Sequence, residues 1–146
     1  MPVDVLTDTF IARPPALVGA FAGDPSRAPE WYENIKSVEW KTEPPLAVGS
    51  EIAFVAYFLG RRLAYTYAVR EFLPGERLVM STSDGPFPME TTYTWSPEGE
   101  GTRMTLRNRG EPAGFSVVVA PIMALAMRRA NAADLARLKR VIEGGA

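Results

Sequence analysis

The chain has 146 residues, a formal net charge of −1, and neither histidine nor cysteine. Ser-His and Cys-His nucleophilic sites are therefore excluded, as are metal sites built on imidazole or thiolate, and we expect no metal and no cofactor. A net charge this close to zero gives no electrostatic basis for binding nucleic acid, which requires basic residues to neutralise phosphates.

The proportions of residues are those of a soluble globular protein, with 47% hydrophobic and 23% charged side chains. A chain of this length is expected to form one domain, residues 1–146, that can enclose a pocket as well as a core. The start lacks the basic and apolar segments of a signal peptide, and the longest apolar stretch, Phe115 to Met127, is too short for a membrane span. We therefore expect a cytoplasmic protein without a membrane span.

The first elements are a strand and two short helices. Val3 to Ile11 has the density of Val, Ile, Thr and Phe that is typical of a strand. Two prolines then begin a short helix over Ala16 to Ala22. Asp24 followed by Pro25 is the pattern of an N-cap with proline in the first turn, and it predicts a second short helix that ends near Trp31.

Six further strands follow, separated by segments rich in Gly and Pro. Because short turns join them, neighbouring strands should pair antiparallel, which gives a seven-stranded antiparallel sheet when the first strand is included. The six predicted ranges are Ile35 to Lys41, Ser50 to Phe58, Arg62 to Phe72, Arg77 to Ser83, Met89 to Ser96 and Thr102 to Arg109.

A register can be predicted from the faces of these strands. A turn at Gly60 and Arg61 would pair Phe58 with Leu63, Ala56 with Tyr65, Phe54 with Tyr67 and Ile52 with Val69. In the last hairpin the predicted pairs are Met89 with Asn108, Thr91 with Leu106, Tyr93 with Met104 and Trp95 with Thr102, with Glu90 opposite Arg107 and Thr94 opposite Arg103 on the other face. The sheet would then have one apolar face and one solvated face.

From Gly114 to Glu143 the hydrophobic period changes to that of a helix, with Pro121 near its start or at a kink. One side of this helix is apolar and should lie on the apolar face of the sheet. Its members are Met123, Ala124, Met127, Ala130, Leu135, Leu138, Val141 and Ile142.

Methionines and polar aromatic side chains gather on the predicted interior. Methionine fills irregular space, so this stripe is compatible with an ordinary core or with a pocket for apolar ligands. The tyrosine and tryptophan polar groups favour a pocket, although hydrogen bonds within the protein would also satisfy them. The predicted ligand-binding residues are Trp40, Phe54, Tyr65, Tyr67, Met80, Tyr93, Trp95, Met104, Met127, Asn131 and Asp134.

Asn131 and Asp134 interrupt the apolar stripe of the last helix. A carboxylate there is costly unless it is paired or hydrated, so Asp134 is either a polar group of the pocket or a member of a salt bridge. A separate apolar patch on the solvated face of the sheet could support a homodimer. That patch consists of Ala53, Val55, Tyr57, Ala64 and Ala68.

The order of elements resembles the START-like helix-grip (SRPBCC) superfamily, in particular its bacterial polyketide cyclase/dehydrase-like members. The matching stretches are Ile11 with Pro14-Pro15 and Val18, Asp24 with Trp31, Val48-Gly49, Gly60-Arg61, Val69-Arg70-Glu71 before Pro74, Gly101-Thr102-Arg103, and Leu135 with Leu138-Lys139 and Glu143. The resemblance implies an α+β fold in which the sheet wraps around the long C-terminal helix. Related branches bind lipids, hormones or quinones, or cyclise polyketides, so the fold leaves the function open.

Two functions follow as hypotheses. The first is the binding of a hydrophobic or aromatic small molecule, including lipids, in a cavity between the sheet and the last helix. The alternative is a cyclase, aromatase or dehydratase that acts in the same cavity. In that case Tyr65, Tyr67, Tyr93 and Asp134 are the candidates for proton transfer and orientation, and a base working near neutral pH would need a shifted pKa because histidine is absent.

Overall fold

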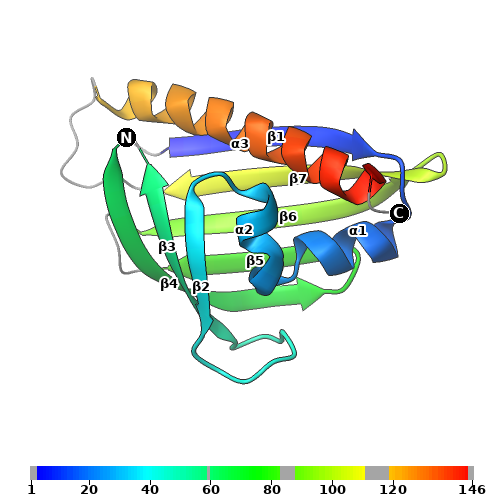
Figure 1. The fold of residues 1–146 in the computed structure, drawn as a ribbon, viewed down its shortest axis with the longest axis horizontal. Coiled ribbons are helices and arrows are strands. Elements are labelled where there is room, and N and C mark those ends of the chain that lie inside the picture. Colours follow the sequence, from blue (N-terminus) through cyan, green and yellow to red (C-terminus); the bar gives the residue numbers. More distant parts are fainter. Residues whose placement is uncertain (1–2, 59, 83–87, 111–118, 145–146) are drawn as a thin grey trace.

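A single antiparallel sheet forms one layer of the molecule, and the helices lie against one of its faces (Figure 1). The computed structural model describes residues 3–58, 60–82, 88–110 and 119–144. Its elements are β1 (Val3–Ile11), α1 (Pro15–Ala22), the 3-10 helix η1 (Pro25–Arg27), α2 (Ala28–Trp31), β2 (Ile35–Trp40), β3 (Glu51–Phe58), β4 (Arg61–Leu73), β5 (Arg77–Thr82), β6 (Met89–Glu98), β7 (Gly101–Gly110) and α3 (Val119–Gly144).

The predicted fold class is confirmed: the sheet has seven strands, in the order β1-β7-β6-β5-β4-β3-β2, and every neighbouring pair is antiparallel. The second predicted helix is divided into η1 and the four-residue α2. Asp24 caps it as expected, since its Oδ1 accepts a hydrogen bond of 3.0 Å from the Ser26 backbone N–H. The predicted start of the last helix, Gly114, lies outside the described residues.

The register predicted for β3 and β4 is wrong by two residues. Phe54 pairs with Tyr65, and Ile52 pairs with Tyr67. β3 continues to Phe58 and β4 begins at Arg61, so Arg61 belongs to a strand and not to the turn as predicted. Gly60 has a φ of 77°, a conformation that glycine adopts without the cost a side chain would impose. Because the slip is an even number of residues, each side chain keeps its predicted face.

The β6 to β7 hairpin shows the same correction. β6 extends to Glu98 and β7 starts at Gly101, so the turn is two residues long, with Gly99 at a φ of 59°. The observed pairs are Met89 with Gly110, Thr91 with Asn108, Tyr93 with Leu106, Trp95 with Met104, Glu90 with Arg109 and Thr94 with Thr105. Glu90 therefore forms its ion pair with Arg109, at 3.8 Å, and Arg107 instead binds Asp4 of β1 at 2.6 Å.

The inner face of the sheet forms the core together with the helices. Register shifts at Ile35/Ser37 in β2 and at Val69/Glu71 in β4 interrupt the pairing, and bulges of this kind bend a strand. The largest fully buried side chains come from the sheet, from α3 and from the short helices. They include Trp31, Ile11, Ile52, Leu78, Met104, Leu106, Leu135 and Leu138.

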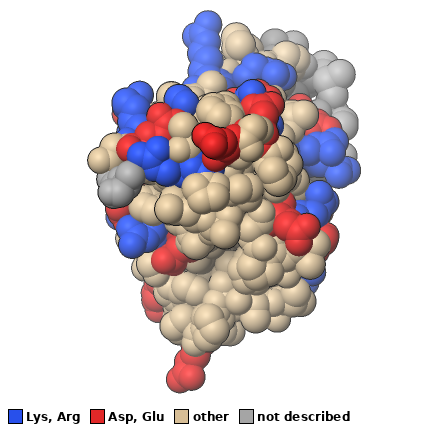
Figure 2. All heavy atoms as spheres, turned by 90° about the vertical axis from the view of Figure 1, so that its right-hand side faces the viewer, with Lys and Arg blue, Asp and Glu red and all other residues tan. Residues whose placement is uncertain are grey.

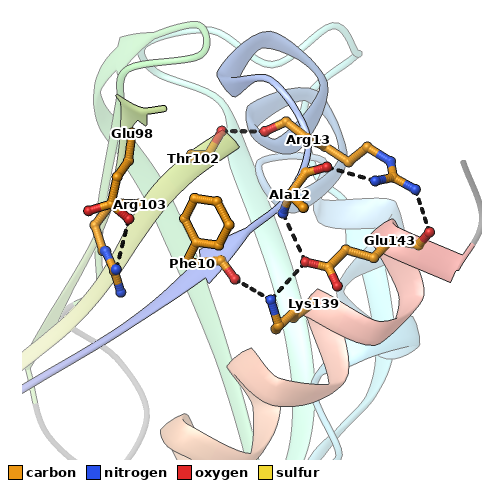
Figure 3. Close-up of polar contacts among 8 residues, drawn as sticks. All are labelled: Phe10, Ala12, Arg13, Glu98, Thr102, Arg103, Lys139 and Glu143. Atoms are coloured by element: carbon orange, nitrogen blue, oxygen red, sulfur yellow. Dashed lines mark hydrogen bonds and ion pairs between the residues drawn. The ribbon is translucent and has the colours of Figure 1, made fainter. Parts of the chain in front are cut away.

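The C-terminal end of α3 is attached to the end of β1 (Figure 3). Glu143 Oε2 accepts hydrogen bonds of 2.8 Å from the Ala12 backbone N–H and from Lys139 Nζ. Lys139 Nζ also donates to the Phe10 carbonyl at 2.7 Å, and Arg13 Nη2 donates to the Glu143 carbonyl. Cations near the last carbonyls stabilise a helix end, so these contacts fix the long helix across the sheet.

Candidate functional site

A cavity of about 580 Å³ lies between the inner face of the sheet and α3. Strands β2 to β7 supply its floor, α3 covers it, and the segment from α1 to α2 closes one side. Cavities of several hundred cubic ångströms are typical of small-molecule sites. Most of the lining is apolar, including Ala28, Ile35, Phe54, Ala56, Leu63, Leu78, Met80, Met89, Met123, Met127 and Ala130.

The structure brings most of the predicted ligand-binding residues to this cavity. The lining residues among them are Phe54, Tyr65, Tyr67, Met80, Tyr93, Met127, Asn131 and Asp134. They come from β3, β4, β5, β6 and α3, so only folding brings them together. Their contact with a ligand remains a prediction.

Trp40, Trp95 and Met104 are not in the lining, which corrects their predicted placement. Trp40 lies on the edge strand β2 and donates from Nε1 to Ser26 Oγ at 2.8 Å. Trp95 and Met104 are paired residues on β6 and β7 and are buried. They do face inward, but α1 lies over this end of the sheet, where its Gly19 approaches the Trp95 ring. The space above them is therefore filled by protein.

Tyr67 begins a chain of buried hydrogen bonds along the cavity floor. Thr91 Oγ1 donates to Asn108 Oδ1 at 2.6 Å, so it accepts the 3.0 Å bond from Tyr67 Oη. Burial raises the pKa of Tyr67 to about 12, although its bond to Thr91 works in the opposite direction. Tyr65 packs edge-on against Tyr67, and burial raises its pKa as well. These phenols are neutral at physiological pH.

Tyr32 and Tyr93 form a second polar pair, with their hydroxyls 2.7 Å apart. Tyr32 also packs on Trp31, with ring centroids 4.1 Å apart. Burial raises the pKa of both phenols well above the ordinary value. Two hydroxyls that share one hydrogen bond use one of their two protons, which leaves the second proton for another acceptor.

Asp134 is buried at the side of the cavity that faces Tyr32 and Tyr93. Its side chain is 3% exposed, and Oδ1 accepts a hydrogen bond of 3.1 Å from the Glu33 backbone N–H. Arg137 Nη1 lies 3.7 Å from the same oxygen. Burial raises the pKa of Asp134 to about 6, while the Glu33 N–H and Arg137 hold it down. Asp134 therefore lines the cavity and also belongs to an ion pair, and its role toward a ligand stays a prediction.

Asn131 lies one turn before Asp134 on α3 and is 5% exposed. Its Nδ2 finds no hydrogen-bond acceptor among the described residues. A buried amide without a partner is uncommon in folded proteins and calls for a physical explanation.

Sequence reasoning missed several polar residues of the lining, among them Tyr32, Thr91 and Asn108. The sequence prediction placed Thr91 and Asn108 on the apolar face of the sheet. A polar side chain on an apolar face is unusual, as Asn131 is on the apolar side of its helix, and this could have identified both residues as candidates. Tyr32 follows the last residue of α2, in a segment without periodicity, so its direction could not be predicted.

Within the described ranges, no three or more acidic side chains gather closely enough to hold a metal ion. None of the described helices is both long and apolar enough to cross a membrane.

The architecture is that of the helix-grip proteins of the START-like superfamily. A protein from Thermus thermophilus, TTHA0849, has a TM-score of 0.85 to this chain at 21% identity, with 98% of this chain and 99% of that chain covered. The ZhuI aromatase/cyclase from Streptomyces sp. R1128 has a TM-score of 0.81 at 16% identity, covering 98% and 94%. A START superfamily protein from Mycobacterium smegmatis has a TM-score of 0.77 at 16% identity, covering 97% and 95%.

The chain belongs to the family described as polyketide cyclase / dehydrase and lipid transport, whose sequence pattern matches residues 2–143. No curated protein is similar enough to count as a match. Identities this low establish the common fold and leave the ligand and any reaction to be inferred from the cavity itself.

Proposed function

We propose that the protein binds a hydrophobic or aromatic small molecule in the cavity between the sheet and α3. The observation that carries this proposal is the cavity itself, about 580 Å³ of space in a chain of 146 residues. Protein interiors are normally close-packed, and unfilled volume lowers stability. A chain that keeps such a volume beneath its longest helix is suited to holding a guest there.

The chemistry of the lining supports the same class of ligand. Apolar side chains from β3, β5 and α3 provide contact area, and a few polar groups can orient the guest. Methionines at positions 80, 89, 123 and 127 can adapt to guests of different shape. The family description includes lipid transport, and we include lipids among the candidate ligands.

Two measurements test this function. Native mass spectrometry of the purified protein should detect a co-purified small molecule. Diphenylhexatriene, a neutral hydrocarbon that fluoresces in apolar surroundings, should bind saturably with one molecule per chain. The matched variants are Ala130→Trp, in the lining, and Ala136→Trp, exposed on the same helix.

Ala130→Trp should fill the cavity and lower probe affinity at least tenfold, whereas Ala136→Trp should leave it unchanged. Equal effects of the two variants, or no saturable binding by the unmodified protein, would overturn the proposed binding function.

An enzyme of the cyclase, aromatase or dehydratase kind is the second candidate. It is favoured by Asp134, a cavity carboxyl whose pKa of about 6 suits proton transfer near neutral pH. Tyr65, Tyr67 and Tyr93 would orient the reacting carbonyl compound. The similar protein from Streptomyces sp. R1128 is an aromatase/cyclase, and this chain shares its fold.

Proton exchange tests that candidate without knowledge of the substrate. The protein should accelerate exchange of the acidic C–H of benzoylacetone with deuterated water, followed by NMR, and Asp134→Asn should abolish the acceleration. Exchange at the rate of buffer alone would rule out the enzyme hypothesis for β-dicarbonyl compounds. The binding hypothesis would then remain.

The expectations about partners and location remain proposals. We propose that the outer face of β3 and β4 supports a homodimer, because Tyr57 and Ala64 are exposed there. Analytical ultracentrifugation should then give a dimer that Tyr57→Glu dissociates.

Figure 2 shows basic and acidic side chains interspersed over the upper part of one face, with no continuous basic area on that view. The absence of a nucleic-acid partner and a cytoplasmic location are both retained as predictions.

A further inference from the structure

We infer that Asn131 is the specificity-determining residue of the cavity, whose amide donates a hydrogen bond to an uncharged oxygen of the ligand, such as a carbonyl. The site would thereby prefer a neutral hydrophobe that carries an acceptor over the corresponding hydrocarbon and over a carboxylate. This inference rests on the proposed binding function and specifies its ligand.

The argument starts from the donor that has no partner. Asn131 is 95% buried from solvent, lines the cavity and, at Nδ2, meets no acceptor among the described residues. Leaving such a buried group without a partner costs free energy. A ligand acceptor placed in the cavity would recover that free energy on binding.

Two hydroxyls of the lining already use their protons within the protein. Tyr67 donates to Thr91, and Thr91 donates to Asn108, so neither hydroxyl proton is available. The Tyr32 and Tyr93 pair retains one proton. Asn131 Nδ2 is the buried side-chain atom of the described lining that has no hydrogen-bond partner, and Asp134 lies one helical turn from it on α3.

The charges around the cavity disfavour an anionic ligand. Asp134 is a buried carboxyl one helical turn from Asn131. Arg137, which forms the ion pair with Asp134, also donates a hydrogen bond to the Trp31 carbonyl. Among the described lining residues Arg62 is the one cation, and it is exposed. A carboxylate held at Asn131 would lose its hydration without gaining a buried counter-charge. An uncharged carbonyl avoids that penalty.

The test uses three probes of nearly the same shape: benzophenone, diphenylmethane and diphenylacetate. Each is titrated against protein loaded with diphenylhexatriene, at pH 8, and its affinity is obtained from displacement. Benzophenone should bind about threefold to tenfold more tightly than diphenylmethane, the range expected of one net hydrogen bond. Diphenylacetate should bind at least tenfold more weakly than benzophenone.

Asn131→Leu completes the thermodynamic cycle because leucine has nearly the same size as asparagine but no donor. In this variant benzophenone and diphenylmethane should bind with equal affinity. An unchanged preference for benzophenone in Asn131→Leu would overturn the inference, as would equal affinities in the unmodified protein.

A measurement on the unmodified protein covers the case in which the variant does not fold. The side-chain amide resonances of Asn131 in a ¹⁵N-correlated NMR spectrum should shift with benzophenone and stay in place with diphenylmethane. Identical shifts with both probes would overturn the inference. Failure of diphenylhexatriene to bind the unmodified protein at all would instead overturn the binding function, so the two failures are distinguishable.

Discussion

At the scale of single residues, ionisation of the buried Asp134 carboxyl lowers the stability of the folded protein. Its pKa of about 6 lies above the ordinary value of 3.8, so the folded protein holds a proton that the unfolded chain releases. By linkage, stability falls as the pH rises from about 4 to about 6 and stays lower above that range. Arg137 reduces this penalty without cancelling it.

Asp134→Asn should therefore stabilise the protein at pH 8, by roughly 1 to 3 kcal/mol, because it removes the buried charge and keeps an oxygen for the Glu33 N–H. The difference from the unmodified protein should vanish near pH 4. Urea unfolding at several pH values measures it. A less stable variant at pH 8 would mean that the ion pair with Arg137 outweighs the cost of burial.

Thr91 is the central member of the hydrogen-bonded chain on the cavity floor. Thr91→Val keeps the shape of the side chain but leaves both Tyr67 and Asn108 without their partner. We expect a loss of about 1 to 3 kcal/mol in the free energy of unfolding. Tyr67→Phe removes only the end of the chain and should cost less, so equal losses in the two variants would contradict the central place of Thr91 in the chain.

At the scale of elements, the contact between α1 and the turn from β4 to β5 is a backbone contact that only glycine permits. A Cβ on Gly19 would lie 2.8 Å from the Cα of Gly75, and Gly75 has a φ of 75°. Alanine normally favours a helix by up to about 1 kcal/mol over glycine. Here the clash should reverse that gain.

Gly19→Ala should lower the free energy of unfolding by about 1 kcal/mol or more, since neither backbone can move without shifting α1 from the sheet. Chemical denaturation followed by circular dichroism measures the change. Gly144→Ala, where an added Cβ meets nothing within 4 Å, is the control and should stay within about 0.5 kcal/mol of the unmodified protein. A stabilised Gly19→Ala would show that α1 can shift freely.

At the scale of the whole molecule, the cavity lowers the stability of the fold but provides space for a ligand. Ala130→Leu adds apolar atoms to the lining and should raise the free energy of unfolding by about 1 kcal/mol while weakening diphenylhexatriene binding. Ala136→Leu, exposed on the same helix, should change neither quantity appreciably. If Ala130→Leu were destabilising with unchanged probe affinity, the space beside Ala130 would be filled in solution.

The sequence predicted those residues of the candidate site whose position depends only on which face of a strand or helix they occupy. Alternation along β3 and β4 placed Phe54, Tyr65 and Tyr67 on one face, and the helical period placed Asn131 and Asp134 toward them. The exclusion of Trp95 was not predictable, because it depends on where α1 lies over β6 and β7. Tyr32 was missed because no period applies between α2 and β2.

The sequence by itself determined the order of elements, the antiparallel sheet, the two faces of each strand and the inward side of α3, because local periodicity and turn composition encode them. Only the tertiary structure decided the register within each hairpin. A slip of two residues preserves both faces, so the hydrophobic pattern cannot distinguish the alternatives. The cavity was also decided by the tertiary structure, because unfilled volume depends on how far α3 and α1 stand from the sheet, and that distance is set by packing between segments remote in the chain.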